Sequence, residues 1–268
     1  MINPPDLRPL SVILTSLLIA TASAQNGPKV TVVPAPPNPF KYEKTLYHWK
    51  KFITATVFWI GEKPTQNNPT PNHKSSWDQN WQQNYGGYDN PDPSARRGYI
   101  PRAFTPKLNP FYIALPYNDC VNHKTHKREA SRVIPWFKRY RPRPGQTVCK
   151  GRWVQIVSNK KICYAQWEDC GPFTTTDWQY VFGNSKSLNT KNQNAGIDVS
   201  PAVRDYLGVD NKFQCHWRFI EFSQIPRGPW SLYGTNNPFV NYKANPDLIA
   251  KERYLEYLRK KKARTYSR

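Results

Sequence analysis

Short stretches rich in β-branched and aromatic residues recur along the chain and predict a mainly β fold. Strands are expected at residues 52–60, 111–115, 153–157, 162–167 and 217–222. The third and fourth of these alternate apolar and polar residues, so we expect them to pair as a hairpin that turns at Asn159 and Lys160. No internal repeat is present. Strands of this length, mixed with short helices, favour one β-barrel domain over residues 46–234.

Two short helices are predicted between the strands. Residues 127–137 have the composition of a helix that leads into a basic loop. Residues 201–207 are typical of a short helix, because Ser200 is suited to cap its start and Gly208 its end.

Two longer segments do not fit the strand pattern. Residues 61–110 are rich in Asn, Pro, Gly, Asp and aromatic residues without a sustained period, and we expect a long ordered loop there. Fifty such residues within a compact domain usually carry function. Residues 235–268 form a basic tail, in which apolar residues from Leu248 to Leu258 recur at helical spacing and predict a helix.

The N-terminal 24 residues predict a signal peptide. An apolar run at residues 10–20 is followed by Ala22-Ser23-Ala24, the small residues that signal peptidase requires, so the mature chain is expected to begin at Gln25. Residues 25–45 are a Pro-rich linker. Because the apolar run is too short to span a bilayer, we expect a secreted or periplasmic protein without a stable membrane anchor.

The charge of the chain points to an anionic partner. There are 39 Lys and Arg against 18 Asp and Glu, a formal net charge of +21. Residues 123–161 carry 12 basic residues and one Glu, and residues 251–268 carry 8 basic and 2 acidic residues. Two such zones suit an anionic polymer. Export argues against nucleic acid, so cell-wall polysaccharide such as peptidoglycan is the expected partner.

The five cysteines predict up to two disulfides in an oxidising compartment. In the predicted hairpin Cys149 falls opposite Cys170, which leaves Cys163 to pair with Cys215 and Cys120 unpaired. A shift of one residue in the strand register would remove this pairing.

Two motifs resemble the signature of double-psi β-barrel proteins of the rare lipoprotein A and expansin type. They are AQWEDCGPF at residues 165–173 and GIDVSPAVRDYLG at residues 196–208, with weaker similarity at residues 54–59 and 113–116. The resemblance implies a six-stranded double-psi barrel with short helices. It covers about 45 contiguous residues. The long loop and the basic C-terminal helix have no counterpart in the minimal family pattern.

The resemblance also implies a polysaccharide groove lined by Asp169 and Asp198. In related endoglucanases the counterpart of Asp198 is the proton donor, and Glu62 is the nearest carboxylate that could act as the base. Two structural alternatives remain at this stage: Asp198 could cap the helix at residues 201–207, and Asp169 could form an ion pair with an Arg. The rare lipoprotein A enzymes carry a His before their second strand, whereas residues 113–116 here read IALP, without a His.

Aromatic residues near the motifs and in the long loop suit sugar stacking. The predicted glycan-binding residues are Trp77, Trp81, Tyr85, Trp167, Trp178 and Tyr180, and Trp59 and Tyr88 flank the same region. Trp59, Trp153 and Trp217 lie on predicted strands, which favours a core position for these three.

Three functions fit these observations. The first is binding, with possible remodelling, of cell-wall polysaccharide. The second is glycan cleavage by a lytic transglycosylase or an inverting endoglucanase. The third is protein binding by a secreted barrel such as an inhibitor. No cofactor is expected, and no metal is expected either, because His123 and His126 fit a basic loop better than a metal site.

Overall fold

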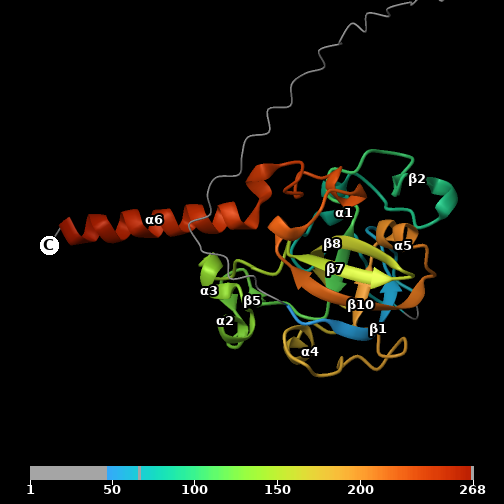
Figure 1. The fold of residues 1–268 in the computed structure, drawn as a ribbon, viewed down its shortest axis with the longest axis horizontal. Helices are drawn as coiled ribbons and strands as arrows, with labels where there is room; N and C mark the ends of the chain where they lie inside the picture. The colour runs from blue at the N-terminus through green and yellow to red at the C-terminus, as the bar shows by residue number, and fades with distance from the viewer. Residues whose placement is uncertain (1–46, 66–67, 267–268) are drawn as a thin grey trace, which may run out of the picture. The chain divides into compact units, whose positions relative to one another are not determined.

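Six strands close into a barrel in the computed structural model, which describes residues 47–65 and 68–266 (Figure 1). They are β1 (Lys50–Val57), β4 (Tyr112–Leu115), β7 (Trp153–Ser158), β8 (Lys161–Cys170), β9 (Ile197–Val199) and β10 (Lys212–Ile220). Their order around the barrel is β1-β10-β7-β8-β4-β9. The pairs β4–β8 and β1–β9 are parallel and the other four are antiparallel. The expected mainly β fold is confirmed, and this mixed, closed barrel is compatible with a double-psi topology.

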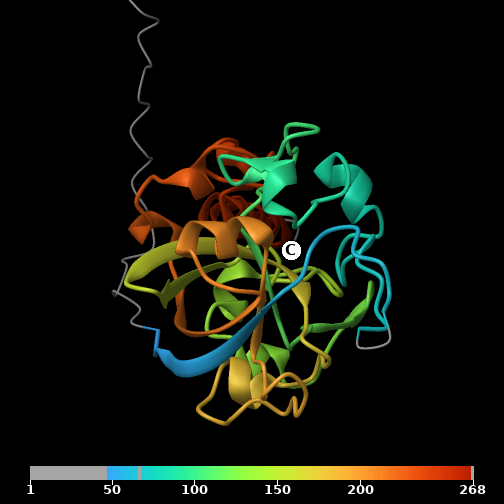
Figure 2. The same ribbon diagram turned by 90° about the vertical axis from the view of Figure 1, so that its right-hand side faces the viewer.

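Short elements surround the barrel, and the long helix α6 (Pro246–Tyr266) extends away from it, as Figures 1 and 2 show. Those before β7 are α1 (Trp81–Tyr85), η1 (Pro93–Ala95), β2 (Arg96–Arg97), β3 (Ile100–Pro101), β5 (Cys120–Asn122), β6 (Thr125–His126), α2 (Ala130–Val133) and α3 (Phe137–Tyr140). Those after β8 are α4 (Trp178–Val181), α5 (Pro201–Leu207), η2 (Phe222–Gln224), η3 (Pro229–Ser231) and η4 (Tyr242–Ala244). None of the described helices is long and apolar enough to cross a membrane.

The predicted hairpin forms with the expected register. Ser158 pairs with Lys161, and the two residues between them, Asn159 and Lys160, have φ of 46° and 59°. A two-residue turn with both φ values positive matches the twist of the flanking strands.

Several predicted boundaries differ from the structure: β1 ends at Val57 instead of residue 60, and β8 continues to Cys170 instead of residue 167. The helix expected at 127–137 is two helices, α2 and α3, because Ile134 precedes Pro135 and is extended, with ψ of 113°. The last barrel strand begins at Lys212 instead of residue 217. Strand β9 was not predicted, since its three residues are too few to show a period.

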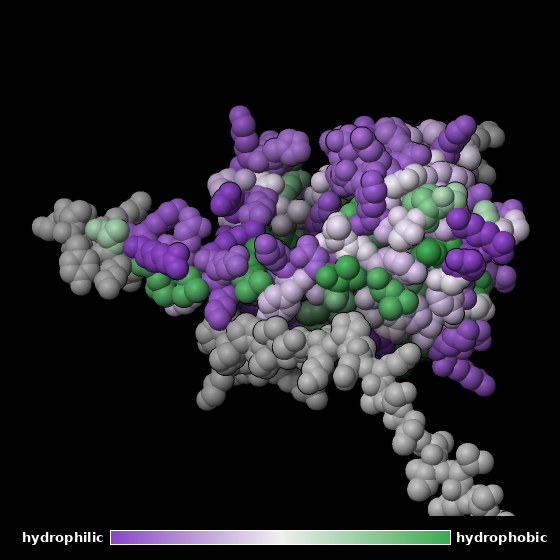
Figure 3. All heavy atoms as spheres, turned by 90° about the horizontal axis from the view of Figure 1, so that it is seen from above, coloured by the Kyte–Doolittle hydropathy of each residue, from purple (hydrophilic) through white to green (hydrophobic). Residues whose placement is uncertain are grey.

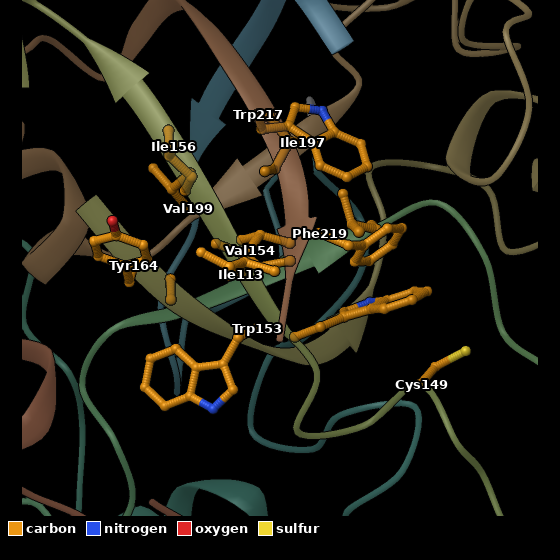
Figure 4. Close-up of a cluster of buried hydrophobic side chains, with 14 of the residues drawn as sticks. Ile113, Cys149, Trp153, Val154, Ile156, Tyr164, Ile197, Val199, Trp217 and Phe219 are labelled. Atoms are coloured by element: carbon orange, nitrogen blue, oxygen red, sulfur yellow. The ribbon is translucent and has the colours of Figure 1, made fainter. Parts of the chain in front are cut away.

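The barrel interior is packed with large apolar side chains (Figure 4). Those that the strands contribute include Ile113, Val154, Ile156, Ile197, Val199, Trp217 and Phe219. Trp153 and Trp217 are 1% and 0% exposed, so the core position expected for these two residues is confirmed.

The long segment at 61–110 is ordered by a buried ion-pair network. Arg96 donates to Asp89 (2.5 Å) and to Asp205 of α5 (3.0 Å). Asp89 is 0% exposed and also accepts a hydrogen bond from the hydroxyl of Tyr112 in β4 (2.8 Å). These contacts attach the segment to a barrel strand and to a helix at once.

The five cysteines are free thiols in the structure. Neither predicted pair, Cys149–Cys170 or Cys163–Cys215, is present as a disulfide in the structure, and both stay predictions. The second pair has a topological obstacle, because β7 lies between β8, which carries Cys163, and β10, which carries Cys215. The predicted signal peptide at 1–24 and linker at 25–45 lie outside the described residues.

The two basic zones of the sequence meet where α6 packs against α3. Arg139 of α3 forms an ion pair with Asp247 of α6. The guanidinium of Arg141 lies 4.2 Å from the ring centroid of Tyr257, and Arg253 donates to the carbonyl of Tyr140 (3.1 Å). Part of the basic charge therefore holds the tail helix in place.

Candidate functional site

A pocket of about 320 Å³ opens beside the ends of β1 and β8 and contains all three predicted carboxylates. Its carboxylate lining is Glu62, Asp169 and Asp198. The rest of the lining is Thr56, Val57, Phe58, Trp59, Thr65, Asn68, Thr70, Asn72, Ala114, Cys170, Gly171, Pro172, Phe173, Asn192 and Asn211. Residues from four separate parts of the sequence thus meet at one end of the barrel.

Asp198 lies on β9 and is partly exposed to this pocket. Its carboxyl group accepts a hydrogen bond from the hydroxyl of Thr56 on the adjacent strand β1. Burial, aided by the negative charges of Glu62 and Asp169, raises the pKa of Asp198 to about 7. A carboxyl group with this pKa keeps its proton at neutral pH in part of the population.

The alternative role for Asp198 as a helix cap does not apply. Ser200 is the N-cap of α5, and its hydroxyl oxygen accepts a hydrogen bond from the backbone N–H of Val203 (3.3 Å). Asp198 is instead a strand residue. Gly171 lies next to it, since a Cβ added at that glycine would be 3.6 Å from one Asp198 oxygen.

Asp169 reaches the same pocket from β8. One of its oxygens accepts two backbone N–H groups, those of Ser76 and Cys170 (both 2.7 Å). Burial raises the pKa of Asp169 to about 6, although these two hydrogen bonds oppose the shift. The described residues contain no ion pair between Asp169 and an Arg, which was the structural alternative for this residue.

Ala114 of β4 lies between the two aspartates in the sheet. It pairs with Asp169 on one side and with Asp198 on the other. The two aspartates are therefore separated by twice the distance between neighbouring strands, which places their Cα atoms roughly 10 Å apart. A small side chain at the middle position leaves the space between the two carboxyl groups open.

Glu62 follows β1 on the other side of Asp198. Its carboxylate accepts a hydrogen bond from the side-chain amide of Asn72 (2.8 Å). Burial raises the pKa of Glu62 above its usual value. The sequence placed this residue near the groove by proximity to the first strand alone, and the structure brings it into the pocket.

Four of the six predicted glycan-binding aromatic residues are in the core. Trp81, Tyr85, Trp167 and Tyr180 are between 0% and 1% exposed, so they have no free face for a sugar. Trp77 and Trp178 are half-buried, pack against the core and do not line the pocket. The prediction of stacking is therefore wrong for these four buried residues, because their ring area fills the core. For Trp77 and Trp178 it stays a prediction.

The aromatic surface of the pocket comes from other residues. Trp59, which was expected in the core, is partly exposed, lines the pocket and donates its indole N–H to the hydroxyl of Tyr88 (3.1 Å). Phe173 is 43% exposed and lines the pocket opposite the β1 side. Trp59 escapes the core because it follows the end of β1, where strand alternation no longer fixes its direction.

The pocket continues into a longer groove. A second hollow shares Trp59, Glu62 and Thr65 with it and is also lined by Tyr88, His73 and Gln82. A third hollow shares His73 and Gln82 with the second and adds Gln79, Asn80, Gln83 and Lys107. The second hollow also contains Lys63, Pro64 and Pro71, and the third is lined mainly by amide side chains.

Thr56 and Asn72 were not predicted as site residues. Thr56 has a signal in the sequence, since it is a polar residue within the first strand and belongs to one of the matched segments. Asn72 has none, because its contact with Glu62 depends on the fold of the long segment. Among the described residues, side chains able to hold a metal ion converge at the β5–β6 hairpin and not in this pocket.

Comparisons with protein-family models, with curated proteins and with solved structures found no match to this chain. The similarity to the rare lipoprotein A and expansin type therefore depends on the two motifs at 165–173 and 196–208. What this similarity implies about the function of the protein is treated below as a proposal.

Proposed function

We propose that this protein binds a cell-wall polysaccharide along the groove that begins at Asp198 and continues over Trp59. The observation that carries the proposal is the meeting of Glu62, Asp169 and Asp198 with a partly exposed Trp in one pocket. Carboxyl and amide groups bind sugar hydroxyls, and a flat ring packs on the apolar face of a sugar. The two further hollows, which share lining residues with the pocket and with each other, support a ligand several sugar units long.

Two surfaces of opposite charge would bind different groups of the polymer. The pocket contains three carboxyl groups and no Lys or Arg among its lining residues, which favours an uncharged sugar unit. Anionic groups of the same polymer fit the basic surface of α3 and α6 instead. This division reconciles an acidic pocket with a chain of net charge +21.

The face of the molecule shown in Figure 3 favours a glycan ligand over a protein ligand. On the face shown in Figure 3, hydrophobic residues form small separate patches among hydrophilic ones. A protein-docking surface is usually a larger continuous apolar patch.

Binding is tested by sedimentation of the mature chain with insoluble peptidoglycan, cellulose and chitin. Trp59→Ala should weaken binding to the preferred polymer about tenfold, since an aromatic contact contributes about 0.5–1.5 kcal/mol beyond its buried area. Phe52→Ala is the matched control, because Phe52 is 78% exposed and does not line the groove. Equal binding by wild type and Trp59→Ala would remove the groove from the binding surface.

A second function, cleavage of the bound glycan, is favoured by the pKa of Asp198. A general acid must hold its proton at the working pH, and a pKa of about 7 meets this requirement. Asp169 or Glu62 would then hold a water molecule as the base in an inverting reaction, for which carboxyl groups about 6.5–9.5 Å apart are needed. In a transglycosylase reaction Asp198 alone is sufficient, because a hydroxyl of the sugar attacks the anomeric carbon.

Product analysis separates these reactions. We expect wild type to release soluble oligosaccharides and Asp198→Asn to bind the polymer without releasing them. Mass spectrometry identifies a hydrolytic product by the added water and a transglycosylase product by its anhydro end. If wild type binds the polymer but releases no product, cleavage is ruled out and only the polysaccharide-binding function stands.

A further inference from the structure

Three side chains with different ligand atoms converge at the β5–β6 hairpin. One carboxylate oxygen of Asp119, the sulfur of Cys120 and one ring nitrogen of His126 all lie within 4.8 Å of one another. Cys120 and His126 are directly paired across the two strands, so their side chains lie on the same face of the hairpin. Asp119 immediately precedes β5.

The loop at 145–148 holds these side chains in place. The ring of His126 is hydrogen-bonded through Nε2 to the carbonyl of Gln146 (2.8 Å). Because a carbonyl only accepts, Nε2 carries the hydrogen and the neutral ring has its lone pair on Nδ1. A histidine that binds a metal ion is normally oriented in this way by a carbonyl at its other nitrogen.

Asp119 is oriented by the same loop. Its two oxygens accept hydrogen bonds from the Thr147 hydroxyl (2.6 Å) and from the Val148 backbone N–H (2.8 Å). The Cys120 sulfur lies 3.3 Å from the carbonyl oxygen of Gly145. All three side chains are therefore fixed by contacts that leave further lone pairs for an ion.

The carboxylate of Asp119 forms no direct ion pair within the described residues, and its hydrogen-bond donors, the Thr147 hydroxyl and the Val148 backbone N–H, are neutral. Asp119 is 0% exposed. The nearby Lys127 directs its ammonium group to the carbonyl of Thr175 and the ring of Tyr117 instead. A buried carboxylate that is held by neutral donors alone keeps its negative charge in a poorly solvated place, and a bound cation would compensate that charge.

We propose that Asp119, Cys120 and His126 bind a zinc ion at the β5–β6 hairpin. An oxygen, a sulfur and an imidazole nitrogen form a donor set that suits Zn²⁺, which takes four ligands in a tetrahedron. Three protein ligands leave the fourth position to water or to a further side chain. On binding, the Cys120 thiol releases its proton to solvent and its sulfur bonds to the ion as thiolate.

The site is separate from the polysaccharide groove. None of its three residues lines the pocket or the two hollows that continue it. It connects the β5–β6 hairpin to the loop at 145–148, next to Cys149, which leads into β7. Metal binding would thus stabilise one wall of the barrel without contacting the ligand.

The experiment uses the mature chain, freed of metal and kept reduced, and Co²⁺ as a spectroscopic probe followed by Zn²⁺. We expect one Co²⁺ per chain, with a thiolate-to-Co²⁺ charge-transfer band that Zn²⁺ abolishes. Cys120→Ser should eliminate the band, and His126→Ala should weaken Co²⁺ binding at least about tenfold. Zn²⁺ should also raise the melting temperature of wild type but not of Cys120→Ser.

Two controls keep the result specific. His123→Ala removes an exposed His of the same hairpin, and Cys163→Ser removes a buried thiol inside the barrel. Both variants should bind Co²⁺ like wild type. If His126→Ala does not fold, His126→Asn gives the same comparison.

The proposal is overturned by any of three results. They are the absence of a charge-transfer band in reduced wild type, a band that persists in Cys120→Ser, and a disulfide that includes Cys120 in the chain isolated from its native source.

Discussion

The two aspartates of the pocket differ in their hydrogen-bond partners and in their pKa values. Asp198 has one hydrogen bond, from Thr56, and two neighbouring carboxylates, whereas Asp169 accepts two backbone N–H groups. The pKa of Asp198 is accordingly the higher one, about 7 against about 6 for Asp169. If the pocket cleaves a glycan, this order assigns the acid to Asp198 and the base to Asp169.

Cleavage of the polymer, if Asp169 is the base, should have a bell-shaped pH profile with its maximum between about 6 and about 7. Activity falls at lower pH because Asp169 becomes protonated, and at higher pH because Asp198 loses its proton. Release of reducing ends measured from pH 4 to 9 gives the profile. In Asp169→Asn most of the activity should be lost, and the fall of activity at low pH should disappear with it. If that fall remained unchanged, the base would be Glu62.

The Asp198→Asn substitution should stabilise the protein at neutral and alkaline pH. The folded-state pKa of Asp198 is above its ordinary value of 3.8, so ionisation favours the unfolded chain and wild type loses stability as pH rises from about 4 to about 7. The neutral amide does not have this penalty. We expect the free energy of unfolding of the variant to exceed that of wild type by on the order of 3 kcal/mol at pH 8 and to differ little at pH 3.5.

Urea denaturation at the two pH values measures this difference. Asp210→Asn is the matched control, since Asp210 is an exposed carboxylate outside the pocket. A variant that is destabilised equally at both pH values would show that Asp198 has a structural role instead.

At the scale of elements, α5 positions β9 and the carboxylate that β9 carries. The helix begins at Ser200, two residues after Asp198, and ends at Gly208, whose φ of 68° is in the left-handed region. Both end signals were predicted from the sequence because capping depends on the residues nearest in the chain.

Gly208→Ala should lower the free energy of unfolding by about 1 kcal/mol, because a Cβ disfavours the left-handed conformation. The cost is one of backbone conformation, since the atoms nearest to an added Cβ are the ends of two flexible side chains, at 3.4 and 3.6 Å. Gly208→Asn should cost clearly less, as Asn tolerates this conformation. Thermal unfolding of the three proteins tests the order, and equal losses for Ala and Asn would contradict it.

At the scale of the whole molecule, the long segment at 61–110 supplies half of the groove and depends on one buried arginine. Arg96 is 5% exposed and joins Asp89 of the segment to Asp205 of α5. Removing it leaves Asp89 buried without its positive partner.

Arg96→Gln should therefore cost about 3–5 kcal/mol of unfolding free energy. Limited proteolysis should cut first within residues 61–110, where the anchoring contact is lost. Arg97→Gln is the matched control, because Arg97 is adjacent and exposed. If both variants resist protease as wild type does, the segment is held by its apolar contacts and not by the ion pair.

The net charge predicts how binding to an anionic wall fraction responds to salt. The mature chain should sediment with this fraction at low salt and be released at 1 M NaCl, where the screening length is roughly 3 Å. Lys251→Glu with Arg259→Glu, on α6, should lower the salt concentration needed for release. Retention that salt does not change would show that charge is a minor part of the contact.

The sequence by itself determined the features that depend on near neighbours in the chain. The β7–β8 hairpin, the start and end of α5 and the motif aspartates were found this way, because turn chemistry, capping and strand ends act over a few residues. Asp169 could be placed at the end of a strand because Gly171 and Pro172 follow it, whereas the shared groove with Asp198 was implied only by the resemblance of the two motifs.

The tertiary structure decided which side chains share a space. Trp81, Tyr85, Trp167 and Tyr180 have the same composition signal as a sugar-binding surface, yet they are buried, while Trp59 is partly exposed at the groove. The three-residue strand β9 has no pattern of its own and exists because β1 and β4 pair with it on both sides. Burial and strand pairing depend on contacts between residues far apart in the chain, and a local pattern of residue types does not record those contacts.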